Sequence, residues 1–424
     1  MTRERSGRDL DAAIEAWMSD VAPPAVPVRV LEEAFARTTA THQARVYPWE
    51  GIARRSDQPR RLTSLALVAT AALIVVALTF GVFGGGSKVG PGPSPTPTPT
   101  PAAAPSGSPP GLASPSAAAP GRVPIVPTAS VPLVGLQSLA TDGKVVWALT
   151  ATGQVVRIDP ATNTAGPGIQ LGATTDLYNG IAVDKNGVWA TDWDTFTLYR
   201  VDPTTGKVVA KILAGKAPKG VLATGSAVWV ADTHDGAVLR VDPATNKVVA
   251  TIPVGRTGNS GPNWLGSGLG SIWVGIPNAL SAVRIDPLTN AIQATIKIPL
   301  KVTPCGGFAI TDAFVWMTSC DGSPIMARID PTTNTVVATL EPGGLASTPA
   351  VIDGAPWVSI DTSPSVPGFL ARVASTTNSV DRELSPGADF GGGGDIVVAA
   401  GSVWVVDGGH DRILRLPLSG FAPG

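Results

Sequence analysis

A tryptophan recurs seven times in the C-terminal part of the chain, each time inside a short apolar segment of β-strand character. The intervals between successive tryptophans run from 40 to 47 residues. A period of this length, with several short strands per repeat, is typical of the blades of a β-propeller. Residues 122–424 are therefore predicted to form an all-β, seven-bladed β-propeller with four-stranded blades, carrying Trp147, Trp189, Trp229, Trp273, Trp316, Trp357 and Trp404.

A second marker, Arg-Ile/Val-Asp-Pro, follows the tryptophan in the first five repeats. In the last two repeats only its arginine and the apolar residue after it remain. Asp-Pro begins a turn because proline fixes its own φ, and Asn246 in the third repeat tolerates the left-handed conformation that ends such a turn. Four strands are expected in that repeat, near residues 220–223, 227–231, 237–241 and 248–252. Both markers recur in most repeats, and we interpret them as structural.

The seventh repeat ends soon after Leu416 and lacks a fourth strand. A matching segment precedes the first repeat, since residues 129–132 resemble residues 250–253 at the end of the third. A strand from the start of the domain is therefore expected to complete blade seven. This closure would remove an open sheet edge that could otherwise pair with other chains.

Residues 62–83 carry no charge and are mostly apolar, which is long enough for a transmembrane helix. A signal peptide is the competing interpretation, but 61 residues precede the segment and it is longer than a typical signal core. A buried core helix is a further alternative. Four arginines lie between positions 54 and 61, and basic residues stay on the cytoplasmic side. We expect a single-pass cell-membrane protein with a cytoplasmic N-terminus and an extracytoplasmic propeller.

The segments beside the span differ in character. Residues 1–61 show two short helical patterns separated by prolines, and are expected to form a cytoplasmic segment that binds a protein partner or stays loosely ordered. Residues 84–121 are rich in Pro, Ser, Thr, Ala and Gly, and are predicted to be a disordered linker. The 31 basic and 32 acidic residues give a net charge of −1, which offers no footprint for nucleic acid.

The third repeat, residues 228–255, closely resembles the YVTN-type repeat of extracytoplasmic propellers, and virginiamycin B lyase and its relatives have similar blades. The resemblance covers about 300 residues. A lyase would imply a metal-assisted elimination by His and Glu at the propeller centre. The propeller region contains only Glu341 and Glu383, both on expected outer strands, so no catalytic residue is carried over. We interpret the domain as a ligand-binding, sensing or interaction module; an extracytoplasmic enzyme of lyase or lactonase type is the alternative.

The loops between second and third strands, together with the connections between blades, are expected to form the binding face. Three aspartates lie three positions after their tryptophans, in blades two, three and seven, and other polar groups lie near them: Asp192, Asp194, Asp232, His234, Asp407 and His410. A divalent cation or a polyhydroxy ligand would suit this acidic arc. Alternatively, the aspartates shape turns.

Further polar residues lie in the connections between blades. Tyr178 precedes blade two, and Asn263 and Trp264 precede blade four. An aromatic ring beside amides can stack on a sugar or a peptide, so carbohydrate, peptide or cell-wall material are the ligands considered. No Ser/His/Asp or Cys/His arrangement stands out, and the expected site is one of binding, with Tyr178 and Trp264 as contributors.

The chain has two cysteines, Cys305 and Cys320, on the first two strands expected for blade five. The turn between these strands centres near Asp312 and Ala313, so facing residues have index sums near 625. The two cysteines have this sum and should face each other closely enough for a disulfide. The extracytoplasmic compartment would permit its formation. Two free buried thiols are the alternative.

Overall fold

The computed structural model describes residues 121–172, 180–255, 257–258, 261–299, 302–304, 306–319, 323–362 and 366–422. The expected cytoplasmic segment, membrane span and nearly all of the linker lie outside these residues. No helix among the described residues is long and apolar enough to cross a membrane.

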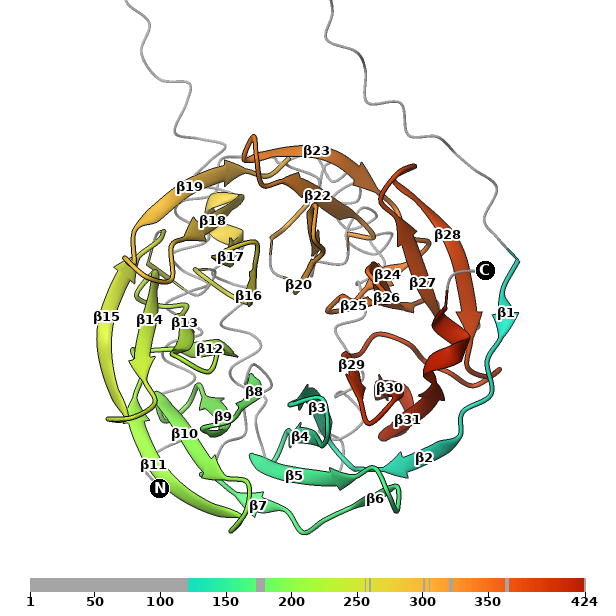
Figure 1. Ribbon diagram of the computed structural model, residues 1–424, viewed down its shortest axis with the longest axis horizontal. Helices are drawn as coiled ribbons and strands as arrows, with labels where there is room; N and C mark the ends of the chain where they lie inside the picture. The colour runs from blue at the N-terminus through green and yellow to red at the C-terminus, as the bar shows by residue number, and fades with distance from the viewer. Residues whose placement is uncertain are drawn as a thin grey trace, which may run out of the picture. The chain divides into compact units, whose positions relative to one another are not determined.

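Seven sheets surround a central opening, which confirms the all-β, seven-bladed propeller (Figure 1). In blade one, β3 (Leu136–Thr141), β4 (Val146–Thr150) and β5 (Gln154–Asp159) are followed by β6 (Thr164–Ala165) and β7 (Ile169–Gln170), which both pair with β5. Blade two contains β8 (Ile181–Asp184), β9 (Gly187–Asp192), β10 (Thr197–Asp202) and β11 (Lys207–Leu213). Blade three contains β12 (Pro218–Ala223), β13 (Val228–Asp232), β14 (Ala237–Asp242) and β15 (Lys247–Pro253).

The remaining blades follow the same order from the centre outward. Blade four contains β16 (Leu265–Gly268), β17 (Ser271–Ile276), the 3-10 turn η3 (Pro277–Ala279), β18 (Ser281–Ile285) and β19 (Ile292–Lys297). Blade five contains β20 (Phe308–Ile310), β21 (Val315–Thr318), β22 (Met326–Asp330) and β23 (Thr335–Leu340). In blade six, β24 (Leu345–Ala346) and β25 (Ala350–Ile352) both pair with β26 (Ala355–Asp361), followed by β27 (Phe369–Ala374) and β28 (Ser379–Ser385). Blade seven contains β29 (Ile396–Ala399), β30 (Ser402–Asp407), η4 (Gly408–His410) and β31 (Arg412–Pro417), and η5 (Leu418–Phe421) follows it.

The repeated tryptophans fill the spaces between neighbouring blades. Trp189 of blade two packs with Val228 and Val230 of blade three, and Trp404 of blade seven packs with Val146 of blade one. All seven tryptophans are 2% exposed or less. Because a propeller sheet packs on both faces, its second strand is buried along nearly its whole length, and the tryptophan is the large side chain that fills the contact. Their structural role is confirmed.

In five of the seven blades, the arginine of the second marker forms hydrogen bonds with the next blade, a contact that we call the latch. Arg415 of blade seven donates from Nη1 to the Pro160 carbonyl at 2.6 Å and to Asn163 Oδ1 at 2.8 Å in blade one. Its guanidinium also lies over Trp404 of its own blade, 5.1 Å from the ring centroid. The same geometry recurs in four other blades, where the arginine contacts the asparagine of the following blade: Arg200, Arg240, Arg284 and Arg328. The left-handed asparagine therefore also serves as the acceptor of an inter-blade latch.

Arg415→Ala is expected to lower the free energy of unfolding by about 2–3 kcal/mol, because it removes two charged hydrogen bonds to blade one, a third to Ser402 of its own blade and a cation–π contact. Arg157→Ala is the matched control. In blade two, Gly206 takes the repeat position of the asparagine and has no side-chain acceptor, and Arg157 pairs with Asp159 of its own blade at 4.0 Å. The control should cost under about 1 kcal/mol. Urea denaturation of both variants measures the difference, and equal losses would rule out the latch.

Closure of the ring by an N-terminal strand is confirmed. β2 (Ala129–Pro132) pairs antiparallel with β31 as the outer strand of blade seven. The sequence did not indicate a second pairing at the start of the domain. β1 (Val123–Pro124) pairs parallel with β28 on the outer edge of blade six. Between these strands, Ile125 is 5% exposed and packs in the core beside Phe421. We call residues 122–133 the clasp, since they join blades six and seven.

The hairpin of blade five has the expected register. Phe308 faces Met317 and Ile310 faces Val315, both with an index sum of 625. Cys305 and Cys320 themselves lie outside the described residues, so the disulfide stays a prediction.

Candidate functional site

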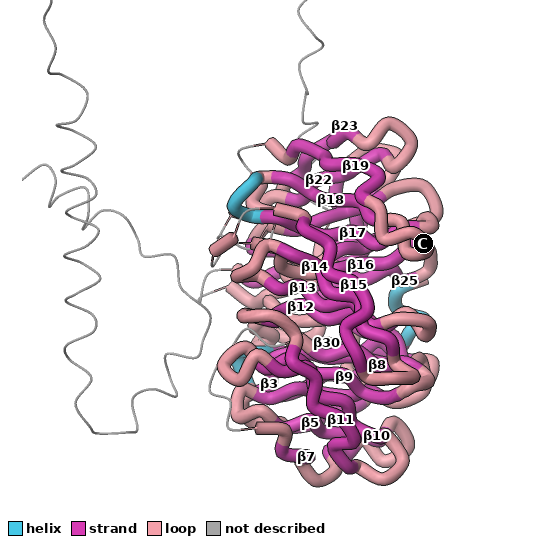
Figure 2. Tube along the Cα trace, turned by 90° about the vertical axis from the view of Figure 1, so that its left-hand side faces the viewer, coloured by secondary structure: helices cyan, strands magenta, loops and turns pink. Residues whose placement is uncertain are grey.

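The loops of each blade emerge at two opposite faces of the ring, seen edge-on in Figure 2. Because neighbouring strands are antiparallel, the loops between second and third strands share a face with the connections between blades. We call this the upper face. The Arg-Ile/Val-Asp-Pro turns, between third and fourth strands, lie on the opposite face.

The three aspartates after the tryptophans were expected in exposed loops, and this expectation was wrong. Asp192, Asp232 and Asp407 end their second strands and are 0%, 2% and 0% exposed. Each strand end is covered by the connection that enters the same blade. Their side chains therefore belong to the packed part of the upper face, and replacing them should affect the fold.

Their Oδ1 atoms accept backbone hydrogen bonds from loops. Asp232 Oδ1 accepts from Lys216 N at 3.1 Å, and Asp407 Oδ1 accepts from Gly391 N at 3.0 Å; both donors lie 16 residues earlier. Ser319 of blade five accepts from Thr303 N with the same spacing. This acceptor position thus ties the connection entering a blade to the end of its second strand.

Asp192 uses the same oxygen for a local turn. Its Oδ1 accepts from Asp194 N at 3.1 Å and from Thr195 N at 3.2 Å, whereas its buried Oδ2 has no hydrogen-bond partner in the part of the chain that the structure describes. The turn-forming interpretation therefore fits Asp192, whereas Asp232 and Asp407 bind the connection that enters their blade.

The histidines lie in separate blades. His410 Nδ1 is 3.1 Å from Asp407 Oδ1, and His234 Nδ1 is 3.6 Å from Asp235 Oδ1. Both rings are partly exposed, at 42% and 49% of the side chain. Among the described residues there is no group of three or more His, Cys, Asp or Glu that could hold a metal ion. Tyr178 lies outside the described residues.

Trp264 lies against the inner strands of blades two and three, although it belongs to blade four. A Cβ atom built on Gly180 would lie 3.2 Å from its Cζ3 atom, and one built on Gly220 would lie 3.2 Å from its Cε3 atom. These separations are tighter than ordinary contacts. The backbone carbonyl oxygen of Lys219 lies closer still, 2.8 Å from the Cβ position of Gly180, and that of Asn263 is nearer yet to the Cβ position of Gly220, so the backbone would have to shift to accept a side chain at either glycine. The ring is half-buried. The adjacent Asn263 is 5% exposed, and its Oδ1 has no hydrogen-bond partner among the described residues.

Sequence reasoning missed Asp395, which lies nine residues before Trp404, at the start of the inner strand of blade seven. Its Oδ2 accepts from Ser138 Oγ at 2.7 Å and from Leu139 N at 3.0 Å in blade one. Burial raises the pKa of Asp395, while these hydrogen bonds and one from Thr348 of blade six lower it. The carboxyl thus joins three blades.

Asp395 and Trp264 occupy the same position in their repeats. This position lies nine residues before the tryptophan of each repeat. Aligning the repeats would have identified both residues, because the other five repeats have a small residue there. We call this set the inner ring: Ser138, Gly180, Gly220, Trp264, Gly307, Thr348 and Asp395.

No protein-family model matches the chain, and no curated protein matches it in sequence. The fold is similar to solved propellers. Selenomethionine-substituted virginiamycin B lyase from Staphylococcus aureus has a TM-score of 0.57 and 16% identity, covering 68% of this chain and 98% of the lyase. A streptogramin B lyase has a TM-score of 0.55 and 15% identity over 67% of this chain and 94% of its own. The Pan2 WD40 domain of Neurospora crassa has a TM-score of 0.51 and 13% identity, and the match covers 66% of this chain and 88% of that domain. At these identities the similarity shows the fold alone.

Proposed function

We propose that the protein is a membrane-anchored, extracytoplasmic propeller that binds a ligand on its upper face. The observation that carries the proposal is the placement of Trp264. A half-buried indole lies on the inner ring over two glycines, beside a buried amide oxygen that no described residue binds. An aromatic ring with one accessible side and adjacent polar groups is a common arrangement for binding a sugar or a peptide. Cell-wall material contains both.

The anchoring rests on the sequence. The uncharged segment 62–83, the arginines before it and the linker 84–121 would hold the propeller outside the cell membrane. Residues 1–61 would then remain available to a cytoplasmic protein partner. We propose Asp194, His234, His410 and Tyr178 as further polar contacts of the ligand on the same face.

Binding is favoured over catalysis by where the acid–base residues lie. Glu383 is on the outer strand of blade six, 8% exposed at its side chain, and 3.2 Å from Arg122 Nε. Glu341 follows the outer strand of blade five and is exposed. Neither glutamate approaches the inner ring, and the histidines lie in blades three and seven.

An extracytoplasmic lyase or lactonase is the second candidate, because two of the similar structures are lyases of streptogramin-type compounds. A third similar structure, with a TM-score of 0.56 and 15% identity, is a catalytically inactive histidine-to-alanine variant of virginiamycin B lyase from Staphylococcus aureus with quinupristin. Such an enzyme would convert the bound compound, whereas a binding module would release it unchanged.

Trp264→Ala is expected to weaken ligand binding by about 30-fold, because truncating a buried aromatic anchor commonly costs about 2 kcal/mol. The probes are peptidoglycan fragments, oligosaccharides, short peptides and quinupristin, screened by thermal shift on the full chain and then titrated. Trp193→Ala, a half-buried tryptophan of the upper face outside the inner ring, is the control. Equal affinity of the parent protein and the Trp264 variant for a confirmed ligand would place the site elsewhere. Recovery of chemically altered probe would favour the enzyme.

A further inference from the structure

Blades three and seven use the same aspartate position in different ways. Asp407 of blade seven and Asp232 of blade three each end a second strand and bind the entering connection through Oδ1. The residue that faces each aspartate on the third strand differs: it is Arg412 in blade seven and Ala237 in blade three. The two blades therefore show one carboxylate position with and without a facing cation.

In blade seven the facing arginine binds the second carboxylate oxygen. Arg412 Nε donates to Asp407 Oδ2 at 2.7 Å, and its Nη2 donates to Asp389 Oδ2 at 2.9 Å. The guanidinium is thus held between one buried and one exposed carboxylate. This geometry shows that the space beside the second oxygen accommodates a guanidinium ion in this fold.

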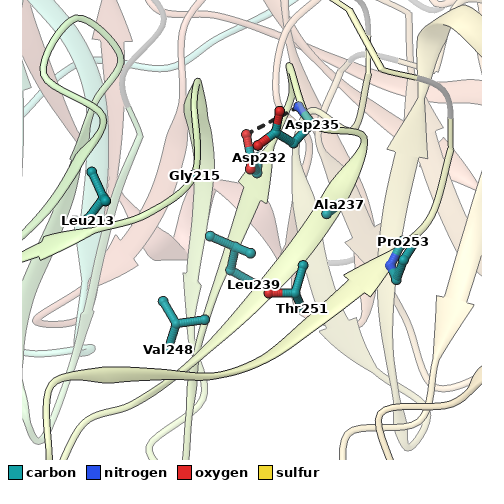
Figure 3. A pocket seen from close by; sticks show the side chains of 9 residues that line it. All are labelled: Leu213, Gly215, Asp232, Asp235, Ala237, Leu239, Val248, Thr251 and Pro253. Carbon is teal, nitrogen blue, oxygen red and sulfur yellow. Dashed lines mark hydrogen bonds between the residues drawn. The ribbon is translucent and has the colours of Figure 1, made fainter.

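In blade three, no side chain among the described residues donates to Asp232 Oδ2. Ala237 faces Asp232 with only a methyl group, and although Asp232 is only 2% exposed, both residues line a pocket of about 340 Å³. Asp232 and Asp235 lie at one end of the pocket, and Leu213, Leu239 and Val248 lie farther along it (Figure 3). The volume is near the lower limit of ligand sites in proteins, about 300–1,000 Å³.

The charges at this pocket favour a cation. Lys216 Nζ lies 3.0 Å from Asp235 Oδ1, and its side chain is 65% exposed, so an ammonium already binds at one edge through a weak surface pair. Burial is the largest cause that raises the pKa of Asp232, and repulsion by Asp235 adds to it. A cation at Oδ2 would offset both effects, because opposite charge favours the ionised carboxyl.

The wall of the pocket is shaped for this oxygen. Gly215 has a φ of +82°, and a Cβ built on it would overlap Asp232 Oδ2. Any other residue would therefore displace the carboxylate. The apolar side chains beyond it match the methylene stem of a long basic group, which can lie along apolar surface while its charged end meets a carboxylate.

We propose that the pocket between blades two and three binds a guanidinium or primary ammonium group on an aliphatic stem, with Asp232 Oδ2 taking the part that Asp407 Oδ2 plays for Arg412. Asp235 is the second carboxylate, in the role of Asp389. The ligand chemistry is that of an arginine or lysine side chain or of a free alkylamine. The inference goes beyond the binding role proposed above, because the pocket is formed by the outer part of blade three and does not include Trp264.

The test uses the full chain and three probes titrated by calorimetry or NMR: agmatine, a Gly-Gly-Arg-Gly-Gly peptide, and the same peptide with citrulline in place of arginine. We expect agmatine and the arginine peptide to bind, and the uncharged citrulline peptide to bind at least 10-fold more weakly. Tighter binding of the arginine peptide than of agmatine would indicate a protein ligand, and equal binding would indicate a free amine.

Two substitutions separate binding from folding. Asp232→Asn keeps an acceptor for the loop amides but removes the charge, so it should weaken agmatine binding about 10- to 100-fold. Ala237→Arg should provide the facing guanidinium internally, abolish binding and raise the melting temperature. Asp389→Asn, which removes an exposed carboxylate from blade seven, is the control that should leave agmatine affinity unchanged. The proposal is overturned if the citrulline peptide binds as well as the arginine peptide, if neither cation binds, or if Asp232→Asn leaves affinity unchanged.

Discussion

A chain that begins at Gly135 is expected to melt far below one that begins at Gly121, or to aggregate. It lacks the clasp. Val131 and Ile125, which are 1% and 5% exposed, leave the core with it. The outer edges of blades six and seven lose β1 and β2, and β31 becomes an unpaired edge strand that can pair with other chains.

The size of the effect follows from the interactions that the clasp makes with blades six and seven. Each buried aliphatic side chain contributes about 1.5–3 kcal/mol. The backbone hydrogen bonds of the clasp, including Ile125 N to the Ser385 carbonyl and Thr128 N to the Arg415 carbonyl, contribute about 0.5–1.5 kcal/mol each. Arg122 adds an ion pair with Glu383 and lies 4.1 Å from the centroid of the Phe369 ring. Together these contributions are comparable with the total stability of an ordinary domain, about 5–15 kcal/mol.

Differential scanning calorimetry and size-exclusion chromatography measure this result. A chain that begins at Pro127 keeps β2 but lacks β1, and it should melt between the other two. Val126→Ala is a control within the clasp, because Val126 is 78% exposed. Identical melting of the chains that begin at Gly121 and Gly135 would show that the clasp adds nothing to closure.

Asp407→Ala is expected to lower the free energy of unfolding by about 3–5 kcal/mol, because it removes the fully buried partner of Arg412. It also leaves the Gly391 amide without its acceptor. Asp407→Asn should cost less than Asp407→Ala, since it keeps an acceptor for that amide. Chemical denaturation measures both losses.

The control for this prediction lies on the same arginine. Asp389 pairs with Arg412 at 2.9 Å, but its side chain is 63% exposed. Asp389→Ala should therefore cost under about 1 kcal/mol. A loss for Asp407→Ala no larger than that for Asp389→Ala would contradict a buried structural role for Asp407 and support a role in an exposed binding loop.

Only some residues of the candidate site could be predicted from the sequence. Sequence reasoning identified Trp264 and the aspartates after the tryptophans, because aromatic and acidic residues stand out in connections between apolar strands. It could not show that Asp407 is neutralised by Arg412 and Asp232 is not, since that difference depends on which residue faces each aspartate across a hairpin. Asp395 was missed because a single aspartate before a strand has the appearance of a turn residue.

The repeat of tryptophan and Arg-Ile/Val-Asp-Pro was sufficient to determine the blade, the number of blades and the closing strand β2. Each repeat carries its own strand pattern and turn residues, so this information is local and appears seven times. Tertiary structure alone decided the latch between Arg415 and Asn163, the parallel pairing of β1 with blade six and the pocket beside Asp232. These features join residues that are far apart in the chain, and their formation depends on the packing distance between neighbouring blades, which no single repeat contains.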